Sequence, residues 1–404
     1  MKIAIVGGGA AGFFAAITAK SRHPEADVCI LERASQVLAK VGVSGGGRCN
    51  LTNSFEDVTD LKQVYPRGHK LMKRLFKSFN ERDAYEWFEA HGVKLVTQAD
   101  HCVFPQSQRS QSIIDCLVNE AHRLGIHILT RHEMKNIVPQ TNGQLSLTLA
   151  DKQMTADRVA ITTGGSPHGK GLAYLEALGH SIETPVPSLF TFNIADKSLR
   201  QLMGTVVIDA IVQMPGTKFR TSGPLLITHW GMSGPAILKL SSHAARHLAE
   251  HEYRLPVAVN WTGCTNNSDV QTLLTELALR HAQKQLGTIP PFQLPSRLWQ
   301  FIIERANLST ERKWAEVGKK GLNKLVETLV NDQYDINGKG AFKEEFVTCG
   351  GIALSNVNLN TLESKVCPHL FFAGEVLDID AITGGFNLQA AWTTGYTVGQ
   401  SIAD

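Results

Sequence analysis

Near the N-terminus, the spacing of apolar residues changes from a pattern typical of a strand to one typical of a helix within about 20 residues. Residues 2–6 are an apolar, β-branched run that is typical of a buried strand, and residues 11–20 have a helical composition. A further apolar run follows at 28–31. Because a strand, a helix and a second strand follow one another so closely, the pattern predicts the first βαβ unit of a parallel sheet.

The same patterns predict further elements along the rest of the chain. The additional predicted helices cover residues 70–91, 113–124, 236–248 and 388–402, and residues 269–331 are mostly helical and charged. The additional predicted strands cover residues 126–129, 146–149, 158–162, 205–213, 255–260 and 369–373. Two prolines within 184–188 indicate a stiff, extended connection between domains.

The turn between the first strand and the first helix carries a glycine motif. Residues 7–12 read Gly-Gly-Gly-Ala-Ala-Gly and fit G-x-G-x-x-G, in which the glycines allow the tight turn, the approach of a pyrophosphate and the packing of helix on strand. Glu32 ends the second strand, 20 residues after Gly12, where such units place an acid that binds ribose hydroxyls. The spacing predicts a dinucleotide site, and the acid favours FAD or NAD over NADP.

A second glycine-rich segment, Ser-Gly-Gly-Gly-Arg-Cys-Asn at 44–50, lies shortly after this unit. Three consecutive glycines let a flat ligand approach the main chain, so we interpret the segment as a wall of the cofactor site. Cys49 either donates a proton to the substrate or is a small residue packed against the cofactor. Arg48 either binds an anionic substrate or phosphate, or anchors the segment through a carboxylate.

The C-terminal end of the chain contains a related arrangement. The strand predicted at 369–373 runs into Gly374 and Glu375, and Gly-Gly-Phe-Asn at 384–387 precedes the last helix. The N-terminus of that helix offers N–H groups and a positive dipole end, which would stabilise a reduced, anionic flavin. We therefore predict that both ends of the chain form one FAD site, in which Glu375 bonds the ribityl chain rather than acting as a base.

These elements predict an α/β fold with a Rossmann-like FAD-binding domain that is split by an inserted domain. The insertion is expected to contain a barrel-like group of β-strands and a helical lobe. The predicted boundaries are 1–187 and 343–404 for the two parts of the FAD-binding domain, 188–264 for the inserted β-rich domain and 265–342 for the helical lobe.

Composition limits the class of protein. With 404 residues, of which 43% are hydrophobic and 19% charged, the chain can bury a large core. Seven cysteines without a C-x-x-C pair argue against a disulfide framework and a structural zinc site, and we expect no metal. No apolar run is long enough to span a membrane, and we expect a cytoplasmic protein. The net charge of +3 does not require a nucleic-acid partner.

Two further segments are compatible with substrate binding. A basic stretch at the start of the predicted helix 70–91 meets either solvent alone, or RNA or another anionic substrate. Its cations are Arg67, Lys70, Lys73, Arg74 and Lys77. The second segment contains His229 and Trp230, before a helix that Ser233 can cap. His229 either flanks a substrate or packs in a core or interface.

The chain resembles the BaiN-like flavoproteins, also known as aminoacetone oxidase family FAD-binding enzymes, over nearly its whole length. The most specific segments are SGGGRCNLTN at 44–53 and FAGEVLDIDAITGGFNLQAAW at 372–392. The resemblance also includes Lys40, GGGAAG at 7–12, THWGMSGPA at 228–236 and TCGGI at 348–352. Residues 36–39 lack the Gly-Arg pair that is common in the family, so the resemblance does not predict a phosphate contact from this turn.

The resemblance implies FAD as the cofactor and indicates which residues would bind it. The glycine motif and Glu32 would hold the pyrophosphate and ribose, backbone near Met134 would meet the adenine, and residues 44–50 would lie along the isoalloxazine. The expected cofactor-binding residues are Gly7, Gly9, Ala10, Ala11, Gly12, Glu32, Arg33, Lys40, Ser44, Gly45, Gly46, Gly47, Arg48, Cys49, Asn50, Met134, Gly164, Gly165, Gly374, Glu375, Gly385, Phe386, Asn387 and Leu388. The expected catalytic residues are Cys49, Arg48 and His229.

Members of this family have been linked to amine oxidation, to reduction of carbon–carbon double bonds in steroid-like acids, and to dihydrouridine formation in ribosomal RNA. We favour an FAD-dependent oxidoreductase that reduces a carbon–carbon double bond by hydride transfer from flavin N5, with a small molecule or a uracil of ribosomal RNA as substrate. Because no second G-x-G-x-x-G follows a strand, NAD(P)H is expected to dock only transiently as reductant. Two alternatives stay open, namely an oxygen-using amine oxidase and an RNA-binding or assembly protein with structural FAD.

Overall fold

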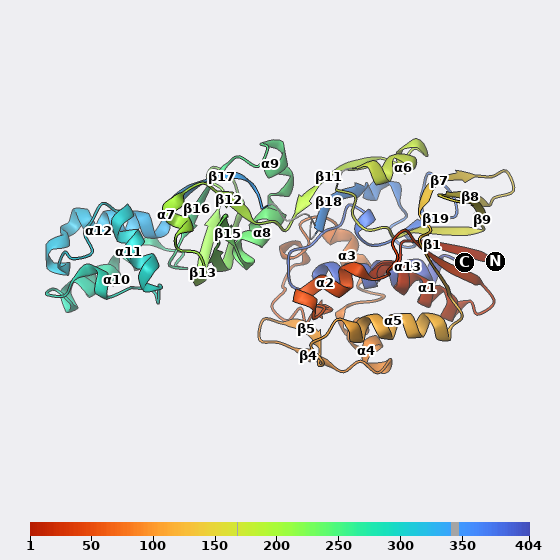
Figure 1. The fold of residues 1–404 in the computed structure, drawn as a ribbon, viewed down its shortest axis with the longest axis horizontal. Helices are drawn as coiled ribbons and strands as arrows, with labels where there is room; N and C mark the ends of the chain where they lie inside the picture. The colour runs from red at the N-terminus through yellow and green to blue at the C-terminus, as the bar shows by residue number, and fades with distance from the viewer. Residues whose placement is uncertain (168, 341–346) are drawn as a thin grey trace. The chain divides into compact units, whose positions relative to one another are not determined.

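A parallel five-stranded sheet forms the centre of the part of the chain that contains both termini. The computed structural model describes residues 1–167, 169–340 and 347–404. The chain divides into two compact units, of which unit 1 comprises Met1–Pro187 and Val347–Asp404, and unit 2 comprises Ser188–Phe346 (Figure 1).

The central sheet of unit 1 has the strand order β19-β10-β1-β2-β6, and every neighbouring pair is parallel. Its strands are β1 (Lys2–Val6), β2 (Asp27–Glu32), β6 (His127–Thr130), β10 (Arg158–Ile161) and β19 (Leu370–Phe372). The central strand β1 buries its apolar side chains, as expected for a parallel sheet covered on both faces. Because β19 comes from the C-terminal segment, both ends of the chain contribute to one sheet.

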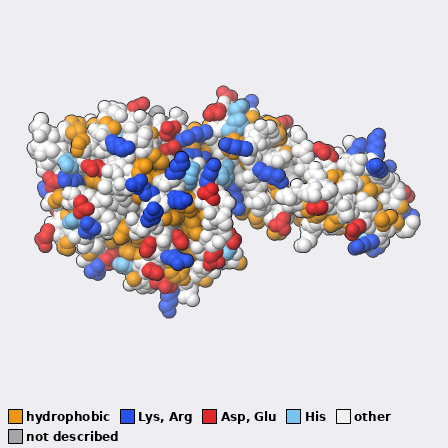
Figure 2. Space-filling view, turned by 180° about the vertical axis from the view of Figure 1, so that it is seen from behind, with side chains coloured by type: hydrophobic (Ala, Val, Ile, Leu, Met, Phe, Trp, Pro, Cys, Tyr) orange, Lys and Arg blue, Asp and Glu red, His pale blue; other side chains and the backbone are white. Residues whose placement is uncertain are grey.

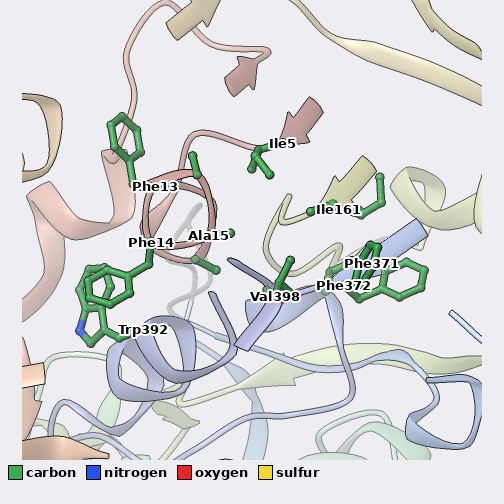
Figure 3. Packing of buried hydrophobic residues seen from close by; sticks show 14 of the residues in the cluster. Ile5, Phe13, Phe14, Ala15, Ile161, Phe371, Phe372, Trp392 and Val398 are labelled. Carbon is green, nitrogen blue, oxygen red and sulfur yellow. The ribbon is translucent and has the colours of Figure 1, made fainter. Parts of the chain in front are cut away.

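Helices α1 (Ala10–Arg22) and α13 (Phe386–Ser401) lie side by side in unit 1 (Figure 1). Phe14 of α1 points toward Trp392 of α13, with ring centroids 5.3 Å apart (Figure 3). A Cβ atom on Gly395 would lie 2.6 Å from the carbonyl oxygen of Ala11, so glycine at this position allows the two backbones to approach closely. Each large apolar side chain buried in this contact contributes about 1.5–3 kcal/mol. The packing therefore fixes α13 against the helix that follows the glycine motif.

The other elements of unit 1 surround this sheet and helix pair. Its helices are α2 (Ala39–Gly47), α3 (His69–Leu75), α4 (Glu81–Ala90), α5 (Gln111–Arg123) and α6 (Ala173–Ala177). Two antiparallel three-stranded sheets contain β3 (Thr52–Asn53), β5 (Cys102–Pro105) and β4 (Leu95–Thr97), and β7 (Met134–Pro139), β8 (Leu145–Leu149) and β9 (Gln153–Ala156). Strands β11 (Ile182–Ser188) and β18 (Val347–Ile352) form a two-stranded sheet where the chain leaves and re-enters unit 1.

Unit 2 contains a closed antiparallel barrel with the strand order β12-β15-β14-β13-β16-β17. The strands are β12 (Phe192–Ile194), β13 (Val206–Gln213), β14 (Arg220–Ile227), β15 (Gly231–Ser233), β16 (Pro256–Asn260) and β17 (Asp332–Lys339). Its helices are α7 (Lys197–Arg200), α8 (Pro235–His243), α9 (Ala245–Glu250), α10 (Asn267–Arg280), α11 (Ser296–Arg305) and α12 (Trp314–Val330). The predicted α/β fold with an inserted barrel and helical lobe is confirmed.

Two local predictions of helices differ from the structure. The single helix predicted over 70–91 is two helices, because Asn80 forms a capping box with Asp83 and starts α4. The helix predicted over 236–248 is likewise divided into α8 and α9. The extended connection predicted at 184–188 lies in β11, and the two units divide inside it, between Pro187 and Ser188.

The last part of the expected helical lobe contains a strand. The predicted helical lobe, 265–342, includes β17, which closes the barrel by pairing with both β16 and β12. Its buried and exposed positions alternate, as is typical of a strand, and Tyr334 and Ile336 are the apolar residues of this pattern. The predicted boundary between 342 and 343 lies outside the described residues. Among the helices that the structure describes, none has both the length and the apolar character needed to cross a membrane.

Candidate cofactor site

In the turn between β1 and α1, some glycines are required by the fold and another is open to a ligand. Gly7 has φ of +117°, which favours glycine, and a Cβ on Gly12 would overlap the Gly7 carbonyl oxygen. These two glycines are therefore required by the turn and by the packing of α1. A Cβ on Gly9, in contrast, would meet no atom within 4 Å. The open surroundings of Gly9 fit a turn that a pyrophosphate approaches.

The N-terminus of α1 has the character of an anion site. It has no side-chain cap and no acidic residue in its first turn. The first N–H groups of a helix lack partners within the helix and lie at the positive end of its dipole. Ala10 and Ala11 begin this turn, so their backbone suits the phosphates of a dinucleotide.

Glu32 lies beside the glycine turn at the end of β2. Its Oε2 accepts a hydrogen bond from the Gly8 N–H at 2.9 Å, and its Oε1 accepts one from the Ala34 N–H at 2.7 Å. The next residue, Arg33, is exposed. The segment that leads to Met134 returns to the same edge, because the His132 N–H donates to the Glu32 carbonyl at 2.8 Å. The predicted ribose and adenine contacts thus lie at one edge of the sheet.

Residues 44–50 form the irregular end of α2. Gly45, Gly46 and Gly47 have φ of +56°, +69° and +85°, a region in which other residues are strained. A Cβ on Gly46 or Gly47 would meet nothing within 4 Å, whereas one on Gly45 would lie 2.8 Å from the Phe104 ring. The segment therefore packs on the protein at Gly45 and leaves its next two residues open.

The side chains of Arg48 and Cys49 are both engaged with protein. Arg48 donates from Nε to the Gly45 carbonyl at 3.1 Å, and its guanidinium lies 4.2 Å from the centroid of the Phe104 ring. Among the described residues it anchors the segment through a carbonyl and a ring, and no carboxylate of that part of the chain pairs with it. The Cys49 side chain is fully buried, and burial raises the pKa of its thiol to about 12. This burial favours the packing interpretation of Cys49.

The two most specific sequence segments bind each other directly. The Asn53 Nδ2 donates to the Gly384 carbonyl at 3.1 Å, across 331 positions of sequence. The Thr52 Oγ1 donates to Gln389 Oε1 at 2.6 Å, and a Cβ on Gly385 would overlap the Thr52 carbonyl. The segment after 44–50 and the N-terminus of α13 therefore form one structure.

Asn387 shapes the loop that precedes α13. Its Oδ1 accepts from the Ala381 N–H at 2.9 Å, and its Nδ2 donates to the Ala381 carbonyl at 2.9 Å. Gly385, which begins α13 with φ of +91°, provides no side-chain cap. The first-turn N–H groups of Phe386 and Leu388 are thus at a second uncapped helix end, where an anionic ring would be stabilised.

Glu375 is held by contacts from three segments. Its Oε2 accepts from Lys40 Nζ at 2.8 Å and its Oε1 from the Thr348 N–H at 2.7 Å. A Cβ on Gly165 would lie 2.7 Å from Glu375 Oε1, and one on Gly164 would lie 3.8 Å from Oε2. The preceding Gly374 has φ of +76° and its N–H donates to the Thr394 hydroxyl at 2.8 Å. Both oxygens of the Glu375 side chain are therefore engaged by donors of the protein.

His229 belongs to unit 2, whereas all other candidate residues belong to unit 1. It is exposed, and its ring makes an edge-to-face contact with Trp230 at 4.5 Å. The strand β15 and helix α8 that follow it correspond to the predicted THWGMSGPA segment.

Several contacts of this region were not predicted from the sequence. The Thr162 Oγ1 donates to the carbonyls of Val6 and Gly7 and so fixes the glycine turn. The Tyr65 hydroxyl donates to the Phe386 carbonyl at 2.9 Å, and Arg67 forms an ion pair with the fully buried Asp380. Asp380 could have been recognised as a candidate from the sequence, because it lies within the family-specific segment 372–392. Arg67 was expected as a cation of the basic stretch, but its largely buried ion pair with Asp380 takes it out of that exposed stretch. No spacing in the sequence relates Tyr65 or Arg67 to the C-terminal segment.

A groove of about 570 Å³ lies elsewhere in unit 1. It is lined by the first residues of β1 and β2, including Lys2 and Asp27, and by strands β8 and β9. Ligands of open parallel sheets bind at the carboxyl ends of the strands. The groove is at the opposite ends, so it is not the dinucleotide site.

The family model of the HI0933-like protein Rossmann domain matches residues 1–401. The chain belongs to this family. It is 28% identical over 415 residues to the 3-dehydro-bile acid delta(4,6)-reductase of Clostridium scindens, covering 100% of this chain and 99% of that protein. It is also 28% identical over 414 residues to the ribosomal RNA dihydrouridine synthase of Escherichia coli, covering 98% and 97% of the two chains.

The fold is similar to that of a solved 3-ketosteroid-delta4-(5alpha)-dehydrogenase from Rhodococcus jostii RHA1. The TM-score is 0.53 at 14% identity, and the match covers 100% of this chain and 96% of that one. The predicted family resemblance and Rossmann-type fold are confirmed. The predicted class, a flavin-dependent oxidoreductase, is confirmed by the relatives, and the family supports FAD as cofactor.

Proposed function

We propose that the protein reduces a carbon–carbon double bond with FAD bound between the two ends of the chain. The observation that carries this proposal is the direct bonding of Asn53 to Gly384 and of Thr52 to Gln389, at the start of α13. This contact joins the segment after the glycines at 45–47 to the uncapped start of α13, and α13 packs on α1, which follows the dinucleotide turn. Such a combination suits a ligand that has a diphosphate at one end and a flat ring at the other.

Different residues of unit 1 would bind the different parts of FAD. Gly9 and the N-terminus of α1 would hold the pyrophosphate, Glu32 the ribose, and backbone near Met134 the adenine. The open backbone of Gly46–Gly47 and the first turn of α13 would face the isoalloxazine. Gly164, Gly165, Gly374, Glu375 and Lys40 would border the ribityl chain. The chemistry that FAD supplies when bound is the transfer of a hydride.

The protein's own part in the reaction is to orient the ring and to stabilise charge. The dipole of α13 would favour a negative charge on the reduced ring by about 0.3–1 kcal/mol or more where water is excluded. The engaged carboxylate of Glu375 would keep its place through Lys40 and Thr348. Cys49 supports the segment from inside the protein, and its neutral thiol acts as a packed apolar group.

The substrate is proposed from the relatives. One is named as a reductase of a 3-dehydro-bile acid and another as a synthase of dihydrouridine in ribosomal RNA. Dihydrouridine differs from uridine by hydrogen added across one carbon–carbon double bond, so both names are consistent with reduction of an unsaturated ring. We propose a uracil of ribosomal RNA as the substrate and NAD(P)H as a reductant that docks transiently.

The test compares modified nucleosides in ribosomal RNA from cells with and without this protein. Loss of one dihydrouridine on deletion, restored by the wild-type gene, is the expected result. An unchanged nucleoside profile would remove ribosomal RNA as the substrate. Anaerobic mixing with NADPH or with an amine then tests the reaction class, because bleaching of the flavin by NADPH is expected and bleaching by an amine alone would point to an oxidase.

A further inference from the structure

The segment between Asp60 and Glu81 concentrates positive charge. It contains six cations and no carboxylate, although the whole chain has 40 lysines and arginines against 37 acids. The cations are Lys62, Arg67, Lys70, Lys73, Arg74 and Lys77. A solvated helix face in a nearly neutral protein normally mixes both signs. The imbalance is therefore a local feature that needs its own explanation.

Helix α3 presents these charges on one side. Leu71, Met72 and Leu75 are buried, whereas Lys70 and Lys73 are exposed. Lys70, Lys73 and Arg74 have the spacing i, i+3 and i+4, which places them along one face of α3, and Lys77 lies in the turn that follows the helix. We call the exposed cations Lys62, Lys70, Lys73, Arg74 and Lys77 the α3 surface. Lys and Arg side chains gather on one face of unit 1 in Figure 2.

Helix geometry by itself does not account for the α3 surface. Cations are favoured in the last turn of a helix, which applies to Lys73 and Arg74. Lys62 precedes the helix, and Lys70 is in its first turn, where a cation is unfavourable. Among the described residues, Lys70, Lys73 and Lys77 form no ion pair within the protein. The surface thus carries charges that are available to a partner.

The α3 surface is fixed to the start of α13. The Tyr65 hydroxyl bonds the Phe386 carbonyl at 2.9 Å, and the ring of Phe55 lies 5.5 Å from Phe76 and 5.0 Å from Phe386. The Arg67–Asp380 ion pair joins the loop before α3 to the segment before α13. A polyanion on the α3 surface would therefore be held at a fixed position relative to the proposed flavin-facing helix end.

We propose that the α3 surface binds the phosphate backbone of the RNA strand that carries the base to be reduced. The inference rests on the proposed function in naming RNA, and on the charge and anchoring described above for its location. A phosphate backbone supplies a row of negative charges that matches a row of lysines. An anionic membrane is a poorer match, because interfacial helices expose large apolar side chains beside their cations, and those of α3 are buried.

The test measures binding of a fluorescein-labelled oligouridylate of about 20 nucleotides to the FAD-loaded full-length protein. The α3 variant is Lys70→Gln/Lys73→Gln/Lys77→Gln. The matched control is Lys319→Gln/Lys320→Gln/Lys324→Gln, which removes the same charge from exposed positions of α12 in unit 2. Flavin absorbance and thermal unfolding of both variants check that each is folded and loaded.

The α3 variant is expected to bind about tenfold or more weakly near 100 mM KCl, and the slope of log Kd against log salt should fall by about 2. The control should change Kd by less than about threefold. Equal weakening of both variants, or no weakening of the α3 variant, would overturn the proposal. So would a loss of binding to anionic phosphatidylserine vesicles with unchanged RNA binding. Because the assay needs no turnover, its result is independent of whether the wild-type protein reduces uracil.

Discussion

The Nζ atom of Lys40 lies 2.8 Å from Oε2 of Glu375, although the two residues are 335 positions apart. The two side chains differ in exposure, at 58% for Lys40 and 19% for Glu375. An exposed ion pair contributes about 0–1 kcal/mol. The Glu375 carboxylate also accepts from the Thr348 N–H, so its removal leaves a backbone donor without this acceptor. We therefore expect the loss of the Glu375 side chain to disturb this part of the site more than the loss of the Lys40 side chain.

We expect Glu375→Ala to weaken FAD binding by about tenfold or more, which corresponds to about 1.4 kcal/mol. Lys40→Ala should weaken it by less than about fivefold, the limit for an exposed pair. Titration of the deflavinated protein with FAD, followed by flavin fluorescence, measures both. Glu176→Ala, at an exposed position of unit 1, is the control. An equal or larger effect of Lys40→Ala would contradict this assignment.

The glycines of the dinucleotide turn should separate into structural and ligand-facing positions. Gly12→Ala places a methyl group against the Gly7 carbonyl and should lower the free energy of unfolding by about 1–3 kcal/mol. The methyl group of Gly9→Ala would lie in open space, so the free energy of unfolding should change by less than about 0.5 kcal/mol. The affinity for FAD should fall, because the methyl group would lie where the pyrophosphate is proposed to bind. Urea unfolding of the deflavinated variants and FAD titration make the comparison. A stable Gly12→Ala protein would show that the turn can relax.

The sequence predicts local features of this molecule better than its long-range ones. The strand, turn and helix around Gly7 are encoded by neighbouring residues, and the prediction is confirmed there. The bond from Asn53 to Gly384 spans 331 positions, and no spacing rule relates two residues so far apart. Strand β17 itself has a local alternating pattern, but its pairing with β12 and β16 is set by tertiary packing and has no local signal. Of the candidate site, the glycine segments were recognisable and the ion pair of Asp380 was not.

The effects of substituting Arg67 and Asp380 on the free energy of unfolding should be coupled, because the two side chains form a buried ion pair. Asp380 is fully buried, so Arg67→Met should destabilise the protein by about 3–5 kcal/mol because it leaves a buried charge. The double variant Arg67→Met/Asp380→Leu should be more stable than Arg67→Met alone. Urea unfolding of the two single variants and the double variant provides the cycle. Simple addition of the two single effects would mean that the residues act independently.

Cys49 should be replaceable without loss of chemistry. Because its thiol is buried among protein atoms, Cys49→Ala should keep turnover within about threefold of wild type and lose about 1 kcal/mol of stability. Turnover of the identified substrate under NADPH is the measurement, with Cys49→Ser as a second variant that restores size and polarity. A drop of about 100-fold or more in both variants at full FAD loading would return Cys49 to the role of proton donor.

Alkaline pH should weaken the fold through its buried thiols. Burial raises the pKa of Cys49 to about 12 and the pKa of Cys102 to about 11, so both stay protonated in the folded protein. In the unfolded chain a thiol loses its proton above about pH 8.5. The unfolded state then binds fewer protons than the folded state, and the free energy of unfolding falls as the pH rises, by up to about 1.4 kcal/mol per pH unit for each thiol.

The stability that these thiols contribute is fully present below about pH 8.5 and is lost as the pH rises toward their folded pKa values. Urea unfolding at about pH 8, 9 and 10 should therefore show a smaller pH dependence in Cys49→Ala/Cys102→Ala than in wild type. The difference isolates the two thiols, because lysines and tyrosines titrate in both proteins. An identical pH dependence in the two proteins would mean that the Cys49 and Cys102 thiols titrate alike in the folded and unfolded chains, and that neither is held neutral by its surroundings.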